Sequence, residues 1–313
     1  MNLSIFNSKF LKNRILRSLI AVFSFLSIYQ FLIITKLVKP SNGMHQWQNN
    51  LIRLQRYAYQ DFSNLNLVIV GSSIANNLPA SDIGSSVINL AMSGGCAQTG
   101  IESVARKSSK PAILLIEINE TINRKVDEQA IRSIYNPFLY NLRLYIPMLR
   151  EEYQPVSTLS PRVFSIVNKI MSLARLVNKP KTIRSVASGT NRDNQLTKTL
   201  INQAIEKYTT PLSEKEKSLF REEAEHIKFQ ISKLNKDGVR VVLFDIPRDP
   251  HLQATVQGKQ LKALAKELFP VSNYEWLPEP APRDWITYDG VHLVTSDAKD
   301  YTAFLKNQLF IKK

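Results

Sequence analysis

The nine residues LNLVIVGSS, at positions 65–73, decide the fold of this chain. The run is short, apolar and rich in β-branched residues, and it ends in three small residues, which is typical of a buried parallel strand that meets a tight turn. Two similar runs follow, SVINLA at 86–91 and AILLIEI at 112–118, and the segment 96–107 between them favours a helix. Strands that alternate with helices predict a parallel sheet with helices on its faces.

The alternation breaks between about 124 and 210, where aromatic residues and arginines give way to a polar segment rich in Ser, Thr and Asn. We interpret this stretch as a mostly helical insertion followed by a flexible loop in the polar segment around 184–198. The insertion is either a lid or docking surface, or a helical excursion that packs on the sheet. Alternation resumes with an amphipathic helix at 213–236 and a fourth strand, VRVVLFDIP, at 239–247. A weaker fifth strand is predicted at 271–276 and a last helix at 295–309.

The amino-terminal region contains an uncharged run of 18 residues at positions 18–35. A helix of this length is close to the thickness of the bilayer core. Four basic residues precede the run and two follow it, which favours a cytoplasmic amino terminus. These residues are Lys9, Lys12, Arg14, Arg17, Lys36 and Lys39.

Two other interpretations of this run are a cleaved signal peptide and a buried core helix. No small-x-small cleavage pattern follows it, and the flanking basic residues disfavour burial. The sequence therefore predicts a cytoplasmic amino terminus and transmembrane signal-anchor at 1–39 and a juxtamembrane segment at 40–62. An α/β domain at 63–313, with the insertion at about 124–210, would then lie outside the cytoplasm at the cell membrane.

The chain of 313 residues has a formal net charge of +15, from 41 basic and 26 acidic residues, which suits a surface that faces anionic lipid or anionic polymer. No helix-turn-helix, zinc pattern or basic run interleaved with aromatics is present, so nucleic acid is not expected as a partner. The single cysteine, Cys96, excludes an intrachain disulfide, and we expect it to pack against a helix. Glu223, Glu225 and His226 lack a recognised metal spacing, so neither a metal nor a cofactor is predicted.

Small and polar residues follow the predicted strands. Gly71-Ser72-Ser73 follows the first strand, Gly94 the second and Asn119 the third, while Asp289 and His292 precede the last helix. Ligands bind beyond the carboxyl ends of parallel strands, so we expect these residues at one edge of the sheet. A serine hydroxyl needs a base such as histidine to become a nucleophile, an aspartate orients that histidine, and fixed N–H donors stabilise the oxyanion.

This order of motifs resembles the SGNH (GDSL-type) hydrolase superfamily, whose blocks supply a serine, a glycine, an asparagine and an Asp-x-x-His pair. The family's Gly-Asp-Ser block reads Gly-Ser-Ser here, which maps the nucleophile onto Ser73 and gives Ser72 the place of the usual aspartate. The Asn-x-x-x-Ser-Gly block matches positions 89–94. The Asp-x-x-His block matches YDGVHL, which contains Asp289 and His292.

The third block of the family is generally Gly-x-Asn-Asp, whereas positions 117–120 of this chain read Glu-Ile-Asn-Glu. Asn119 is therefore the candidate side-chain donor of the oxyanion hole, with Asn123 as the alternative. The resemblance implies a three-layer, flavodoxin-like parallel sheet and the catalytic residues Ser73, Asp289 and His292. It also implies an oxyanion hole formed by Ser73, Gly94 and Asn119.

Arg248 and His251 follow the fourth strand, where they could contact substrate or lie in a solvated loop. Membrane-anchored members of this superfamily modify cell-surface or exported polysaccharides, commonly beside a multispanning membrane acyltransferase. The resemblance therefore implies transfer of an acyl group, with acetyl expected, to or from an extracytoplasmic polysaccharide through an acyl-serine. The alternatives are a membrane-tethered esterase or lipase and a catalytically silent subunit that binds glycan or scaffolds an export complex.

Overall fold

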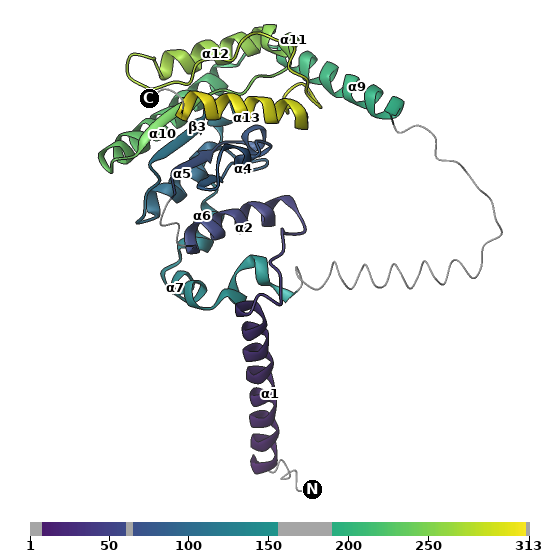
Figure 1. The fold of residues 1–313 in the computed structure, drawn as a ribbon, viewed down its shortest axis with the longest axis vertical. Helices are drawn as coiled ribbons and strands as arrows, with labels where there is room; N and C mark the ends of the chain where they lie inside the picture. Colours follow the sequence, from purple (N-terminus) through teal and green to yellow (C-terminus); the bar gives the residue numbers. More distant parts are fainter. Residues whose placement is uncertain (1–7, 61–64, 156–189, 311–313) are drawn as a thin grey trace, which may run out of the picture. The chain divides into compact units, whose positions relative to one another are not determined.

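The computed structural model describes residues 8–60, 65–155 and 190–310 of the chain (Figure 1). The chain divides into two compact units. The helical unit comprises Met1–Gln55 and Asn136–Pro180, and the α/β unit comprises Arg56–Tyr135 and Lys181–Lys313.

The helical unit begins with the long helix α1 (Ser8–Ile34). Its stretch Asn13–Ile34 is long and apolar enough to cross a membrane, because 22 residues span about 33 Å at 1.5 Å per residue. The segment 40–62 contains the helix α2 (Gln46–Tyr59), whose residues are divided between the two units. The other elements of the helical unit are α7 (Pro137–Tyr145), η2 (Pro147–Leu149) and η3 (Glu151–Tyr153).

The α/β unit is built on a four-stranded sheet in the order β2-β1-β3-β4, and every pair of neighbouring strands is parallel. The strands are β1 (Leu67–Val70), β2 (Val87–Asn89), β3 (Ile113–Glu117) and β4 (Arg240–Phe244). All four lie inside the predicted runs, so these predictions are confirmed. Their continuous apolar character reflects burial of the sheet on both faces.

The predicted fifth strand at 271–276 is wrong. A turn takes up most of it, because the backbone N–H groups of Asn273 and Tyr274 both donate to the carbonyl of Pro270. What remains is a single parallel bridge between Leu243 and Trp276 at the edge of the sheet.

Helices cover both faces of the sheet, as predicted. Val68, Val70 and Leu114 point into one hydrophobic cluster, and their neighbours Leu67 and Ile69 point into the other. The first cluster includes residues of α5 (Ala97–Arg106), α10 (Glu214–Lys236) and α12 (Val256–Leu268). The second includes residues of α3 (Ser73–Asn76), α4 (Ala80–Ile83) and α13 (Thr295–Phe310).

Local sequence explains where α10 starts and stops. Ser213 caps its first turn in a reciprocal pair of hydrogen bonds with Glu216, and Gly238 follows its end with a φ of +84°. The remaining elements of the α/β unit are η1 (Glu120–Asn123), α6 (Glu128–Tyr135), α9 (Thr190–Thr209) and α11 (Pro250–Ala254). The predicted insertion at 124–210 is mostly helical in its described parts, and its central portion at 156–189 lies outside the described residues. The flexible loop predicted around 184–198 is wrong from Thr190 onward, where α9 begins.

Candidate active site

Ser73 is the first residue of α3, directly after β1 and one residue beyond the helix cap. The cap is Ser72, whose hydroxyl oxygen accepts a hydrogen bond of 3.2 Å from the backbone N–H of Ile74. This turn presents the Ser73 hydroxyl at the carboxyl edge of the sheet, and Ser73 is only partly buried. Ser72, the other serine of this turn, is buried, and its hydroxyl oxygen serves as the helix cap.

The structure brings the three predicted catalytic residues together in one chain of hydrogen bonds. Nε2 of His292 lies 2.9 Å from Oγ of Ser73, and Nδ1 of His292 lies 2.8 Å from Oδ2 of Asp289. The second carboxylate oxygen of Asp289 accepts from the backbone N–H groups of Val291 and His292. When Nδ1 carries the ring proton toward Asp289, Nε2 is left as an acceptor for the serine proton.

The charges of this pair support each other. Burial alone would raise the pKa of Asp289, but hydrogen bonds from the His292 side chain and backbone outweigh it and hold that pKa at about 2. The hydrogen bond to Asp289 raises the pKa of His292 above 6.5, against an opposing effect of burial. Asp289 therefore stays ionised near neutral pH and is positioned to stabilise a protonated His292 ring.

The loop after β2 lies against the serine turn. The backbone N–H of Met92 donates to the carbonyl of Gly71 over 3.0 Å. Two residues later, Gly94 adopts a φ of +69°, a backbone conformation that favours glycine. The guanidinium of Arg124 donates a hydrogen bond of 3.0 Å to the Gly94 carbonyl. The N–H groups of Ser73 and Gly94 make no hydrogen bond to any residue in the described part of the chain, so both remain available as donors.

Asn119 completes this edge from the end of β3. Its amide oxygen accepts from the N–H and the hydroxyl of Thr121, which turns the amide nitrogen toward the serine turn. That nitrogen donates to Oγ of Ser72 over 3.1 Å. An amide nitrogen has two hydrogens, so Asn119 keeps a second one for an oxyanion. Asn123, the alternative donor, ends η1 four residues further along the chain.

A residue that sequence reasoning missed, Glu117, lies beneath the nucleophile turn. Its Oε2 accepts from the backbone N–H of Ser72 over 2.6 Å, and its Oε1 is buried without a hydrogen-bond partner among the described residues. Burial raises the pKa of Glu117 to about 7, more than the hydrogen bonds from Ser72 lower it. The available signal was a single acid at the end of the otherwise apolar strand ILLIE.

The buried Glu117 carboxyl predicts a pH-dependent stability. Because its pKa is raised from 4.5 to about 7 in the folded chain, ionisation destabilises the fold progressively as the pH rises from about 4.5 to 7. Glu117→Gln removes this ionisation, so the wild-type chain should lose about 2 kcal/mol more unfolding free energy than the variant between pH 5 and pH 8. Urea unfolding of the full chain in detergent at both pH values measures this difference.

The control for this experiment is the same change at Glu222, which is exposed on α10. Glu222→Gln should leave the wild-type pH dependence unchanged. An identical pH dependence for wild type and Glu117→Gln would show that the carboxyl of Glu117 has the same pKa in the folded and unfolded chains.

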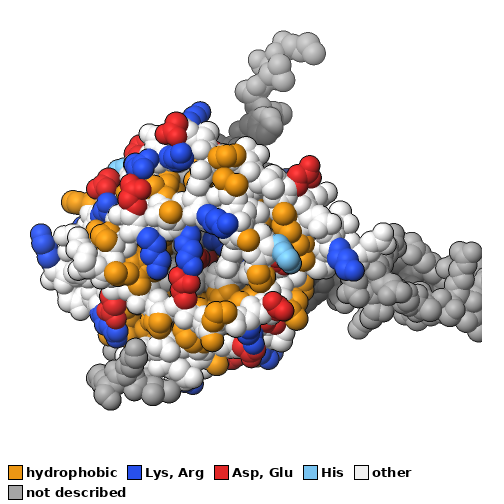
Figure 2. All heavy atoms as spheres, turned by 90° about the horizontal axis from the view of Figure 1, so that it is seen from above, with side chains coloured by type: hydrophobic (Ala, Val, Ile, Leu, Met, Phe, Trp, Pro, Cys, Tyr) orange, Lys and Arg blue, Asp and Glu red, His pale blue; other side chains and the backbone are white. Residues whose placement is uncertain are grey.

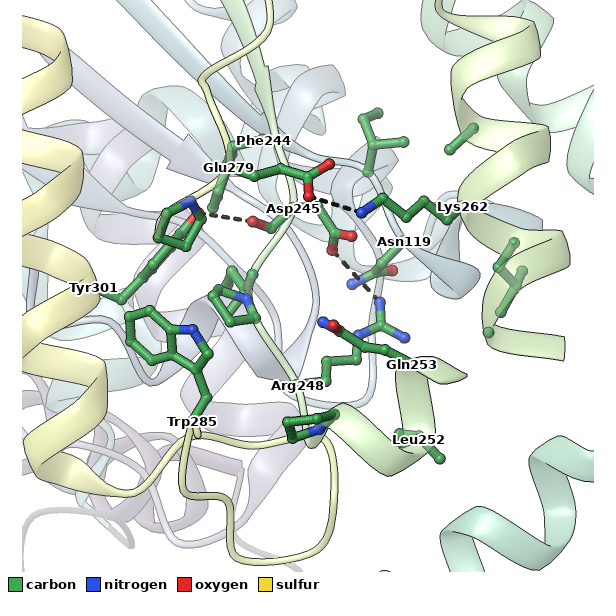
Figure 3. Close-up of a pocket in the computed structure, with 18 of the residues that line it drawn as sticks. Asn119, Phe244, Asp245, Arg248, Leu252, Gln253, Lys262, Glu279, Trp285 and Tyr301 are labelled. Carbon is green, nitrogen blue, oxygen red and sulfur yellow. Dashed lines mark hydrogen bonds and ion pairs between the residues drawn. The ribbon is translucent and has the colours of Figure 1, made fainter. Parts of the chain in front are cut away.

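A cavity of about 280 Å³ opens next to Asn119, beyond the end of β4 (Figure 3). Figure 3 shows the side chains of Arg248 and Lys262 on one side and those of Trp285 and Tyr301 on the other. The cavity also exposes the carboxylate of Asp245. Ser73 and His292 are not among its lining residues, whereas Asn119 lines the cavity and also donates to the hydroxyl of Ser72.

Charges around the cavity are mostly paired. Arg248 forms an ion pair of 2.7 Å with Glu120 and lies 3.6 Å from Asp245, and Lys262 pairs with Glu279 at 2.7 Å. Burial raises the pKa of Asp245, against the opposing charge of Arg248. In Figure 2 the end of the α/β unit that carries α11 to α13 is hollowed, with hydrophobic, basic and acidic side chains around the depression. The cavity therefore offers polar contacts as well as apolar ones.

The two predicted substrate-binding residues differ in position. Arg248 lines the cavity, as its place after β4 indicated. His251 is exposed on α11, outside the cavity lining, and its backbone N–H donates to the capping carboxylate of Asp249. His251 therefore does not line the cavity with Arg248, although the two residues are only three positions apart in the sequence.

Two other sequence predictions concern Cys96 and a metal. Cys96 is buried at the start of α5, with its sulfur 3.4 Å from the carbonyl of Lys125, in agreement with the expected packing role. On α10, Glu222, Glu223 and His226 bring ligand atoms within 4.8 Å of one another, and Glu222 and His226 are exposed to solvent. The prediction that no metal is required stays a prediction.

No family model, characterised protein or solved structure matches the chain. The resemblance to SGNH hydrolases therefore rests on the chain's own motifs, together with the positions that the fold gives them.

Proposed function

We propose that this chain is a membrane-anchored, SGNH-like serine acyltransferase that moves an acyl group, with acetyl expected, to or from an extracytoplasmic polysaccharide. The observation that carries the proposal is the unbroken hydrogen-bonded chain from Ser73 through His292 to Asp289. In this proposal the α/β unit is a three-layer, flavodoxin-like sheet, and the site lies at its carboxyl edge, where such sheets bind ligands.

Acylation begins when Oγ of Ser73 attacks the carbonyl carbon of an acyl ester. Nε2 of His292 accepts the hydroxyl proton as the new C–O bond forms, and Asp289 stabilises the resulting imidazolium. The N–H groups of Ser73 and Gly94 and the amide of Asn119 stabilise the negative oxygen of the tetrahedral intermediate. Collapse breaks the ester C–O bond, and His292 returns the proton to the departing alcohol, which leaves an acyl-serine.

Transfer of the acyl group from the serine to its acceptor uses the same steps in reverse order, with a different alcohol. A sugar hydroxyl gives its proton to His292 and attacks the acyl-serine, and Oγ of Ser73 leaves with the proton. Water as the acceptor would make the same site an esterase. The acyl donor can be an ester delivered by a multispanning membrane partner, as the family resemblance implies.

The cavity next to Asn119 favours a sugar over a long acyl chain. Its volume of about 280 Å³ is at the small end for ligand pockets, and charged groups from Asp245, Arg248 and Lys262 face it. The hydroxyl groups of a sugar can hydrogen-bond to such charged groups, whereas a long alkyl chain cannot.

The proposed anchor is α1. Its Asn13–Ile34 stretch would cross the cell membrane once, with the basic residues before it in the cytoplasm and the α/β unit on the outer side. This arrangement would hold the site near substrates that are made or exported at the membrane.

The direct test is mass spectrometry of the intact full chain in detergent after exposure to an activated acetyl ester. We expect the mass of one acetyl group to be added to the wild-type chain, with the adduct on Ser73. Ser73→Ala should show no adduct, and His292→Ala should form it far more slowly because the hydroxyl has lost its base. Ser81→Ala removes an exposed serine near the same site and should behave like the wild type.

A catalytically silent glycan-binding subunit predicts a different result. In that case wild type and Ser73→Ala would show the same adduct pattern and the same glycan acylation, and the proposed enzyme would be rejected.

A further inference from the structure

Helix α7 of the helical unit turns its apolar side to solvent. No residue of this nine-residue helix is buried, and Phe138, Leu144 and Tyr145 are among its most exposed residues. With Pro137 and Asn141, these exposed positions fall within about 120° of arc at 100° per residue. Asn141 satisfies its own amide by donating to the carbonyl of Pro137 over 2.9 Å. The rest of the helix is also mostly apolar and only partly buried, so α7 presents apolar side chains to solvent where a water-facing helix would present polar ones.

The chain after α7 folds back and holds this face in place. Nε of Arg150 donates to the carbonyl of Arg143 over 2.8 Å, and Nε of Arg143 donates to the carbonyl of Leu149 over 3.1 Å. These guanidinium groups satisfy carbonyls around the carboxyl end of α7. Leu149 is itself exposed and adds to the apolar surface.

The same segment is fastened to the end of α1. The hydroxyl of Tyr29 donates to the carbonyl of Tyr153 over 2.5 Å, and the side-chain oxygen of Gln30 accepts from the N–H of Met148 over 3.0 Å. Gln30 lies four residues before Ile34, so this attachment is about 6 Å from the end of α1. Amphipathic helices at a bilayer surface lie at a similar depth.

We propose that α7 lies in the interface of the bilayer that α1 crosses. Phe138, Leu144, Tyr145 and Leu149 contact the acyl chains, and Arg143 and Arg150 lie at the level of the headgroups. The inference rests on the proposed membrane anchor and does not depend on catalysis. Aromatic and basic side chains are both favoured at this depth, the basic ones by anionic lipid.

Lipid is a better occupant of this face than a second protein because the face continues an apolar surface. Phe31, Ile34 and Leu37, at the same end of α1, are exposed to similar extents. The positions before Tyr29 that are described with side chains are exposed all round the helix. A membrane that surrounds α1 therefore meets α7 without any further partner.

The test uses the full chain in protein-free vesicles of phosphatidylcholine and phosphatidylglycerol. In a Cys96→Ala background, single cysteines replace Phe138 or Tyr145 and carry the environment-sensitive fluorophore NBD. The matched control is Phe229 of α10, which is 69% exposed against 72% for Phe138. A fourth cysteine at Val22 reports on insertion of α1 itself.

Lipids brominated near the headgroup end of their acyl chains should quench the probes at 138 and 145 roughly twofold, with a blue shift of emission. The probe at 229 should change by less than roughly a tenth, as expected of a group in water. The probe at 22 should be quenched best by lipids brominated near the chain ends.

The outcomes separate the inference from the anchor. Quenching at 22 with none at 138 and 145 would overturn the interfacial position of α7 and leave the anchor standing. Absence of quenching at 22 would overturn the anchor and the inference together. Shielding of 138 that needs native membranes rather than pure lipid would assign the face to a protein partner and also overturn the inference.

Discussion

Replacing Asp289 with asparagine is expected to slow acylation of Ser73 by about four orders of magnitude. The carboxylate holds Nδ1 of His292 at 2.8 Å and stabilises the protonated ring, and an asparagine amide can do neither in the same way. The amide can also donate to Nδ1, which would place the ring proton on Nε2 and remove the base from Ser73. Release of the alcohol from an activated ester, measured before the first turnover is complete, reports this rate.

The pH profile of the same variant gives a second measurement. In the wild-type chain Asp289 raises the pKa of His292 above 6.5. Acylation should therefore increase as the pH rises through this raised pKa, because the ring becomes neutral and can accept a proton. Without the carboxylate the pKa of His292 falls, and the remaining activity should reach its plateau at lower pH. His226→Ala, a change at an exposed histidine of α10, should keep both rate and profile. Wild-type rates in Asp289→Asn would remove Asp289 from the mechanism.

Adding one methyl group at Gly71 should strain the turn that carries Ser73. A Cβ at this position would lie 2.5 Å from Oε2 of Glu117 and 2.8 Å from Cβ of Ala75. Both neighbours are held, Glu117 by its hydrogen bond to Ser72 and Ala75 by its place in α3. Gly71→Ala should cost about 1–3 kcal/mol of unfolding free energy and displace the nucleophile turn.

Gly84 provides the matched control for this substitution. Its added Cβ would meet only Val87 Cγ2 at 3.7 Å, an ordinary contact, and its φ of 172° is extended backbone. Gly84→Ala should therefore change the unfolding free energy by no more than about 0.5 kcal/mol. Urea unfolding and the acylation rate of both variants check the prediction, and equal behaviour of the two would show that the turn at Gly71 is not tightly packed.

The strands and the serine site could be predicted because their signals are local. The strands β1, β3 and β4 are apolar apart from Glu117 at the end of β3 and Arg240 at the start of β4, since most of their residues are buried. The site residues lie next to strand ends or before the last helix, and a parallel sheet brings such positions to one edge. These residues are Gly71, Gly94, Asn119 and His292. The predicted strand at 271–276 failed because the turn at Pro270 uses the backbone groups that a strand would need.

The features that could not be predicted depend on contacts between distant segments. Glu117 is separated by 45 residues from the backbone N–H that it binds, and its burial comes from the packed sheet. The cavity is lined by segments from Ile118 to Tyr301 that meet only in the folded chain. The aromatic residues around α7 suggested a lid or docking surface, and their sequence could not show that the apolar side faces outward.

The contact between Ser73 and His292 joins residues that lie 219 positions apart in the sequence. A ribosome that adds roughly 5–20 residues per second needs about 10–40 s to make the chain between them. Throughout that interval the emerging serine has no imidazole beside it and cannot take an acyl group by this route. In the proposed mechanism, chains released before position 292 would therefore be inactive, and the Ser73 hydroxyl could be activated only after position 292 has been made.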